Sequence, residues 1–237
     1  SPWPPLALPA AVAVHLVAVC AAAGSRAPAV AVRGGRGESD RHLSDELVAG
    51  FRSAGLFSRG VPASLGGGEV SVGELIRTIE VIARADAAAA WCAMIQSTSG
   101  IVTAYLAPEG SDEILAAGDP VLGGVYAPLG RAEKVEGGFR ASGRWPFASG
   151  SRHCTWLLGG CLTEGMPPRL MVFRSDELTI HDTWHVSGLA GTGSNDIEAA
   201  DIFVPLTRTC DISTERPAID STPYQFPTFG PLALRLA

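Results

Sequence analysis

Apolar residues recur every three or four positions through the first half of the chain, which is the spacing of an amphipathic helix. Leu47 and Phe51 belong to one such stripe, and Leu75, Ile79 and Ile82 form another. A Val-Pro pair and three successive glycines lie between the two stripes, and these residues predict a loop. The pattern predicts a first half built from helices.

Residues that can cap helices stand directly before these stripes. Ser44 is followed by two acidic residues, and Ser71 begins a capping box with a glutamate three positions later. Such side chains satisfy backbone N–H groups that a helix leaves free in its first turn. Asp86 is expected to cap a third helix, and Ser111 is expected to cap a short fourth one.

The spacing of apolar residues changes after Pro120. Short β-prone runs, separated by glycine and proline, cover residues 121–126, 131–135, 139–142, 154–158, 170–173 and 196–204. Residues 136–138 read Glu-Gly-Gly and are placed to form a hairpin turn. Strands that follow one another without helices between them favour an antiparallel barrel or sandwich.

We therefore expect an α+β fold with an N-terminal helical domain over 1–118 and a middle β-domain, an antiparallel barrel or sandwich, over 119–210. Residues 211–237 read as the start of a further helical domain. The uncharged run from Pro5 to Ala23 has no basic residue before it. We favour a buried first helix for this run over a signal peptide.

Composition and charge exclude several classes of function. The chain is 46% hydrophobic and 18% charged, as a soluble globular protein is. Its net charge of −6 argues against nucleic acid as a partner, and we expect no membrane partner either. The five cysteines are scattered, without a CxxC pair, which argues against a disulfide scaffold or a zinc site and fits the cytoplasm.

Two patterns that invite a cofactor interpretation fail on their context. The glycines of residues 188–193 precede an alternating, strand-like segment, whereas a dinucleotide-binding loop leads from a strand into a helix. His181 and His185 are four residues apart, but that spacing brings side chains together only on a helix. We therefore expect no metal site.

A resemblance begins with residues 143–156, which read Gly-Arg-Trp-Pro-Phe-Ala-Ser-Gly-Ser-Arg-His-Cys-Thr-Trp. This run is similar to the middle-domain segment of the acyl-CoA dehydrogenase superfamily. The resemblance implies that Phe147 packs on the flavin ring and that the Ser149 hydroxyl bonds near its N5 and O4 atoms. Residues two apart in a strand share a face, so both side chains are expected to reach one ring.

Three further stretches keep the order of that family. Residues 84–91 resemble a helical-domain signature whose Trp91 faces the substrate, residues 124–130 resemble a loop over the flavin, and residues 184–196 resemble a late middle-domain loop. The resemblance implies these flavin-binding residues: Tyr126, Pro128, Phe147, Ser149, Gly150, Thr192 and Ser194.

The residues of the motif resemble those of one branch of the superfamily. Acyl-CoA dehydrogenases carry a Thr-Glu-x-x-x-Gly-Ser-Asp type run where residues 126–132 read Tyr-Ala-Pro-Leu-Gly-Arg-Ala. The Trp-Pro-Phe-Ala-Ser-Gly run resembles two-component flavin monooxygenases, such as the oxygenase component of p-hydroxyphenylacetate hydroxylase. That branch implies an oxidoreductase using reduced FMN or FAD from a separate flavin reductase, an aromatic or polycyclic substrate, and Ser149 as the catalytic hydroxyl.

Two alternatives remain open: an acyl-CoA dehydrogenase with bound FAD, and a non-catalytic remnant that binds a partner protein. The resemblance implies a C-terminal four-helix domain that supplies flavin contacts and the core of a homo-oligomer, a tetramer. The chain as given stops before that domain. We therefore expect it to be inactive by itself.

Overall fold

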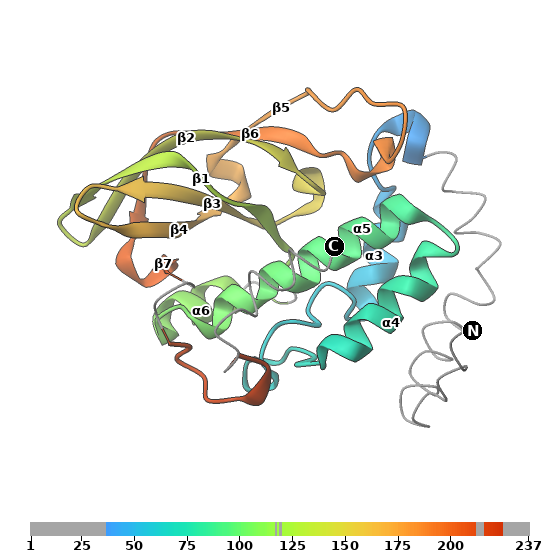
Figure 1. Ribbon diagram of the computed structural model, residues 1–237, viewed down its shortest axis with the longest axis horizontal. Helices are drawn as coiled ribbons and strands as arrows, with labels where there is room; N and C mark the ends of the chain where they lie inside the picture. The colour runs from blue at the N-terminus through green and yellow to red at the C-terminus, as the bar shows by residue number, and fades with distance from the viewer. Residues whose placement is uncertain (1–36, 117, 119, 212–215, 225–237) are drawn as a thin grey trace, which may run out of the picture.

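A computed structural model describes residues 37–116, 118, 120–211 and 216–224 (Figure 1). The expectations for a first helix or signal peptide at residues 5–23 and for a final helical start near residue 230 lie outside these residues. The helices are α3 (Asp45–Ser53), α4 (Val72–Ala83), α5 (Ala87–Ser99) and α6 (Pro108–Leu115). No helix in the described part of the chain is long and apolar enough to cross a membrane.

The strands follow the helices along the chain, so the expected α+β order is confirmed. They are β1 (Leu122–Val135), β2 (Gly138–Ala148), β3 (Trp156–Thr163), β4 (Met166–Arg174), β5 (Thr179–His181), β6 (Asn195–Pro205) and β7 (Thr209–Cys210). Figure 1 shows α5 lying between the sheet and the helices α3 and α4. The expected domain limits at residues 118 and 210 stay predictions.

Three of the four expected helix caps are confirmed. The Ser44 side chain accepts a hydrogen bond from the Leu47 N–H, and Ser71 forms the full capping box with Glu74. Asp86 accepts from the Ala89 N–H at 2.9 Å. Local side-chain chemistry therefore sets where α3, α4 and α5 begin.

The cap expected at Ser111 is wrong. The fourth helix begins earlier, with Pro108 at its first turn, because proline's fixed backbone angle suits that position and its missing N–H costs nothing there. Ser111 lies inside the helix, and its hydroxyl donates to the Thr103 carbonyl at 2.9 Å.

The sheet holds seven strands in the order β5-β6-β2-β1-β3-β4-β7. Residues 136 and 137 form the expected tight hairpin turn between β1 and β2, since Val135 pairs with Gly138. The chain then crosses to the other edge of β1, so β3 runs parallel to β1. An entirely antiparallel sheet was expected, but this crossover makes one pairing parallel; the other described pairings are antiparallel.

The loop expected at residues 124–130 is wrong, because these residues lie inside β1. Two register shifts, one between Val125 and Pro128 and one between Pro128 and Gly130, interrupt the pairing with β3. Bulges of this kind admit a proline, which cannot donate to the ladder, while the strand continues. The two β-prone runs 121–126 and 131–135 therefore form one long strand.

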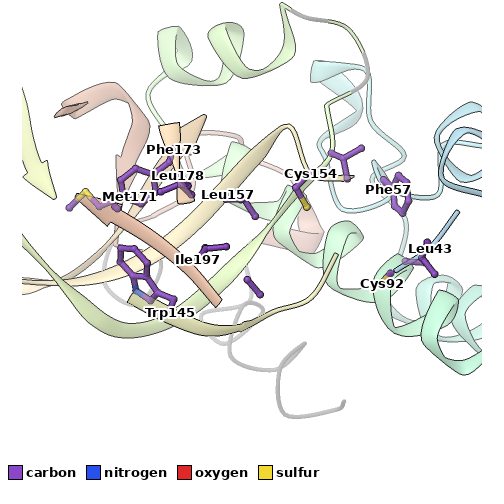
Figure 2. Packing of buried hydrophobic residues seen from close by; sticks show 14 of the residues in the cluster. Leu43, Phe57, Cys92, Trp145, Cys154, Leu157, Met171, Phe173, Leu178 and Ile197 are labelled. Carbon is purple, nitrogen blue, oxygen red and sulfur yellow. The ribbon is translucent and has the colours of Figure 1, made fainter. Parts of the chain in front are cut away.

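Trp145 is the largest fully buried side chain of the sheet. It is fully buried, and its indole N–H donates to the Gly160 carbonyl at 2.8 Å. Glycines on three strands make room for the ring: a Cβ added at Gly130, Gly143 or Gly159 would lie 2.3, 3.0 or 2.7 Å from ring atoms. Figure 2 shows the indole among the buried residues of the strands, with Cys154 on the side toward α5 and Phe57.

Candidate functional site

A group of bonded hydroxyls lies where α5 meets the ends of β2 and β6. The Trp91 indole N–H, on α5, donates to Ser149 Oγ at 2.9 Å. Ser149 Oγ lies 2.7 Å from Ser194 Oγ, and Ser194 Oγ lies 2.7 Å from Thr192 Oγ1. The three hydroxyl residues are buried, between 2% and 4% exposed. Four residues that the sequence resemblance assigned to a site are therefore joined in one hydrogen-bonded group.

The backbone around Ser149 is also fixed. Gln96, fully buried on α5, donates from Nε2 to the Ser149 carbonyl at 3.0 Å. The Gly150 N–H donates to the Thr192 carbonyl at 2.8 Å. Gly150 has a φ of +71°, and a Cβ there would lie 2.3 Å from Gln96 Nε2 and 2.7 Å from His153 Nε2. Only glycine allows this close approach to α5.

Phe147 takes a different environment from Ser149, so the expectation that both share one face of a strand is wrong. Strand β2 ends at Ala148 and its pairing with β6 shifts register between Trp145 and Ala148, so the alternation of faces stops there. Phe147 has a φ of +65° and is 68% exposed. Its ring meets the Trp184 ring edge-on, with centroids 6.0 Å apart.

An exposed phenylalanine in a left-handed conformation is strained, and strain of this kind is often retained for function. Replacing Phe147 with glycine should therefore leave the free energy of unfolding unchanged or raise it by up to about 1 kcal/mol, since glycine adopts a positive φ freely. Urea denaturation measures the change. Phe203, which is 41% exposed in β6, is the matched control: its replacement by glycine should destabilise the fold. A clear loss of stability in the Phe147 variant would contradict the interpretation.

The loop that carries Trp184 is tied to the residues before α3. Arg41 donates to both carboxylate oxygens of Asp182, each at 2.8 Å, and to the Trp184 carbonyl at 3.1 Å. The hydrogen bond from Arg41 holds the pKa of Asp182 below its usual range. Glu38 accepts from the Ala190 N–H at 3.1 Å. In Figure 1 the chain after β5 accordingly runs out to meet the first described segment.

The titratable groups behind Ser149 are neutral at ordinary pH. Burial lowers the pKa of His153 to about 4 and raises the pKa of the Cys154 thiol to about 12; it raises the pKa of Cys92 as well. Within the described ranges there is no group of three His, Cys, Asp or Glu side chains that could hold a metal ion. The site offers hydroxyls, an indole and an amide, a set suited to the polar edge of an uncharged planar ring.

Tyr126 and Pro128, also expected from the sequence to bind the cofactor, lie apart from the hydrogen-bonded cluster around Ser149. Tyr126 packs against a separate apolar cluster that includes Leu106, and burial raises the pKa of its phenol, which bonds to Ser99. Pro128 is exposed. Sequence reasoning did not assign Gln96 to the site, although a glutamine directly after the apolar run 91–95 was a visible signal. Trp184 was quoted within a motif but not given a role.

The comparisons with known proteins agree on one group of enzymes. No protein-family model matches the sequence. The oxygenase component of an FADH2-dependent resorcinol hydroxylase from Rhizobium sp. is 33% identical over 177 residues, which are 72% of this chain and 43% of that protein. Indole-3-acetate monooxygenase from Pseudomonas putida is 32% identical over 201 residues, which are 83% of this chain and 51% of that protein.

Solved structures give the same result. The HsaA monooxygenase from M. tuberculosis matches with a TM-score of 0.76 and 27% identity, over 82% of this chain and 55% of that one. XiaF from Streptomyces sp., solved with FADH2 and glycerol, has a TM-score of 0.84 at 23% identity, over 95% and 59% of the two chains, and shows the shared fold. The chain spans about half the length of the curated relatives it matches.

Proposed function

Because this chain is a homologue of the oxygenase components of two-component flavin-dependent monooxygenases, which have an acyl-CoA dehydrogenase-like fold, we propose that it serves to hydroxylate an aromatic substrate with reduced flavin and O2. One oxygen atom would enter the substrate and the other would leave as water. The observation that carries the proposal is the Ser149 hydroxyl, held between Trp91 and Ser194 two residues after the exposed ring of Phe147.

The residues present fit a flavin. Its tricyclic ring has apolar faces and one polar edge, so it needs an aromatic surface beside fixed hydrogen-bonding groups. Phe147 supplies an exposed aromatic ring and Trp184 a partly buried one against it, and Ser149 supplies a hydroxyl whose position its neighbours set. When bound, reduced flavin would supply the two electrons that activate O2; Ser149 and its neighbours would bind and orient its edge. The Rhizobium relative is FADH2-dependent, and similar structures hold FADH2 or FMN. We propose one of these, delivered by a flavin reductase, as the cofactor.

The experiment joins the chain to the C-terminal domain of the Pseudomonas putida relative and supplies reduced FMN or reduced FAD, 18O2 and a panel of phenols and indoles. Mass spectrometry should find one labelled oxygen atom in an aromatic product. A parallel reaction with FAD, an acyl-CoA and an artificial electron acceptor tests for a dehydrogenase. Oxidation of the acyl-CoA without labelled aromatic product would overturn the proposal in favour of that rival, and no reaction in either arm would favour a partner-binding role.

In the chain joined to a C-terminal domain, Ser149→Ala should raise hydrogen peroxide release per flavin oxidised more than it weakens flavin binding. A single neutral hydrogen bond contributes only about 0.5–1.5 kcal/mol to affinity, whereas loss of the hydroxyl beside the reacting edge removes a group oriented for the chemistry. Peroxide and product are measured together in single turnovers. Ser151→Ala is the control, because Ser151 is buried two residues away and its hydroxyl has no partner. Unchanged partitioning between product and peroxide in Ser149→Ala would remove Ser149 from the catalytic role.

A further inference from the structure

The hydroxyls of the site form a linear chain with a fixed donor at one end. The Trp91 N–H can only donate, and it donates to Ser149. At the far end, Thr192 Oγ1 lies 2.9 Å from the Leu189 carbonyl, which can only accept. Ser194 lies between, 2.7 Å from both Ser149 and Thr192. Each hydroxyl has one proton and two lone pairs, and the Leu189 carbonyl cannot donate, so all three bonds can be made together in one direction only.

In one direction every proton has an acceptor. Thr192 donates to the Leu189 carbonyl, so Ser194 donates to Thr192 and Ser149 donates to Ser194. The proton of Ser149 is then used, and one of its lone pairs takes the Trp91 N–H. A single lone pair remains, so toward any further group Ser149 can only accept.

In the opposite direction Ser149 becomes a donor. Thr192 would donate to Ser194, and Ser194 to Ser149, whose lone pairs would both be occupied. The Leu189 carbonyl would still receive the Thr192 and Trp184 N–H groups, each at 3.1 Å. However, the proton of Ser149, a residue only 4% exposed, would have no acceptor among the chain's own hydroxyls. A buried unmade hydrogen bond is costly, so the first direction is the resting one.

We propose that Thr192 and Ser194 are positioning residues that hold Ser149 as a hydrogen-bond acceptor, so that the site selects reduced over oxidised flavin; this rests on the flavin site proposed above. Atom N5 of reduced flavin carries a hydrogen and donates, whereas N5 of oxidised flavin offers only a lone pair. Reduced flavin can therefore donate from N5 to Ser149 without any change in the hydrogen bonds among the three hydroxyls. To donate to oxidised flavin, Ser149 must turn its proton away from Ser194 and give up that bond, or all three hydroxyls must reverse and the Thr192 bond to Leu189 is given up. Either way one bond among the hydroxyls is lost.

The test compares dissociation constants of reduced and oxidised FMN and FAD, measured anaerobically by equilibrium dialysis up to millimolar concentrations. Thr192→Val removes the acceptor of the Ser194 proton, so Ser194 can donate to Ser149 and leave the Ser149 proton free for oxidised flavin. Ser194→Ala frees the proton of Ser149. Each variant should lower the preference for reduced flavin by about three- to tenfold, the effect of one neutral hydrogen bond, chiefly by tightening oxidised-flavin binding.

Two controls separate this effect from general damage. Thr192→Ser keeps the hydroxyl and should keep the wild-type preference. Ser97→Ala removes another buried hydroxyl of α5, which donates to the Leu56 carbonyl, and should also keep it. Neutron diffraction from crystals in D2O provides a readout without flavin. The deuterium on Ser149 should point to Ser194 in the wild type and should be divided between that direction and others in Thr192→Val.

The outcomes distinguish the two proposals. If wild type binds neither flavin form, the proposed function fails and the selection mechanism fails with it. If flavin binds and Ser149→Ala weakens it, but Thr192→Val and Ser194→Ala keep the wild-type preference, the flavin site stands and the directional hydroxyl chain is overturned. A deuterium on Ser149 directed away from Ser194 in the wild type would overturn it independently.

Discussion

Replacing Trp145 with alanine should lower the free energy of unfolding by about 3–5 kcal/mol, the usual cost of removing a large buried aromatic side chain. The residue is 0% exposed, and its indole N–H satisfies the Gly160 carbonyl. The loss should lie near the upper end of that range, because glycines at 130, 143 and 159 surround the ring and carry no side chains that could move into the cavity.

Urea denaturation followed by circular dichroism measures this loss, and a compensating pair of substitutions tests its origin. Gly159→Ala places a methyl group against the indole and should destabilise the fold by about 1–3 kcal/mol through overpacking. Combining it with Trp145→Phe should recover part of that loss, because the smaller ring leaves room for the methyl. If the two changes are simply additive, the glycines are not there to accommodate the indole.

Acidification from pH 6.5 to pH 4 should remove on the order of 3 kcal/mol of stability through one residue, His153. Burial lowers its pKa in the folded protein to about 4 from an ordinary value of 6.5, and each pKa unit corresponds to about 1.4 kcal/mol. Between these pH values the unfolded chain takes up a proton that the folded chain does not. The stability is therefore fully present above pH 6.5 and declines as the pH falls toward 4.

The variant His153→Phe isolates this contribution. It retains an aromatic ring to stack on Phe57, whose centroid lies 5.6 Å from that of His153, and it leaves no buried polar group, since Nε2 of His153 has no partner. Unfolding free energies measured at several pH values should fall less steeply in this variant than in wild type. His185→Gln, at an exposed position, should keep the wild-type slope. Equal slopes in His153→Phe and wild type would show that His153 is not the group responsible.

Sequence reasoning succeeded where short-range chemistry decides the structure. Ser71 and Glu74 satisfy each other's neighbouring backbone groups three residues apart, and Asp86 caps α5 in the same way. Sequence reasoning failed where a competing residue sets the start of a helix or where a distant strand sets the pairing. Pro108 overrides Ser111 as the start of α6, and the parallel pairing of β3 with β1 depends on which edge the chain crosses to.

The candidate site shows the same division. The motif around Phe147 and Ser149 was visible in the sequence, but their environments depend on contacts across the fold. Ser149 is buried because Trp91, 58 residues earlier, reaches it. The left-handed backbone at Phe147 accompanies a register shift against β6. The rule that residues two apart share a face of a strand takes account of neither the contact from Trp91 nor the register shift.

The ion pair between Arg41 and Asp182 can form only late in the synthesis of the chain. These residues are 141 positions apart, so at about 5–20 residues per second the ribosome needs roughly 7–30 s after making the first to make the second. Helices α3 to α5 can form in that interval, while Trp91 and Gln96 still lack the strand ends that they will bind. The site is therefore among the last parts of the molecule to form, and the face of α5 that carries Trp91 and Gln96 stays uncovered until then.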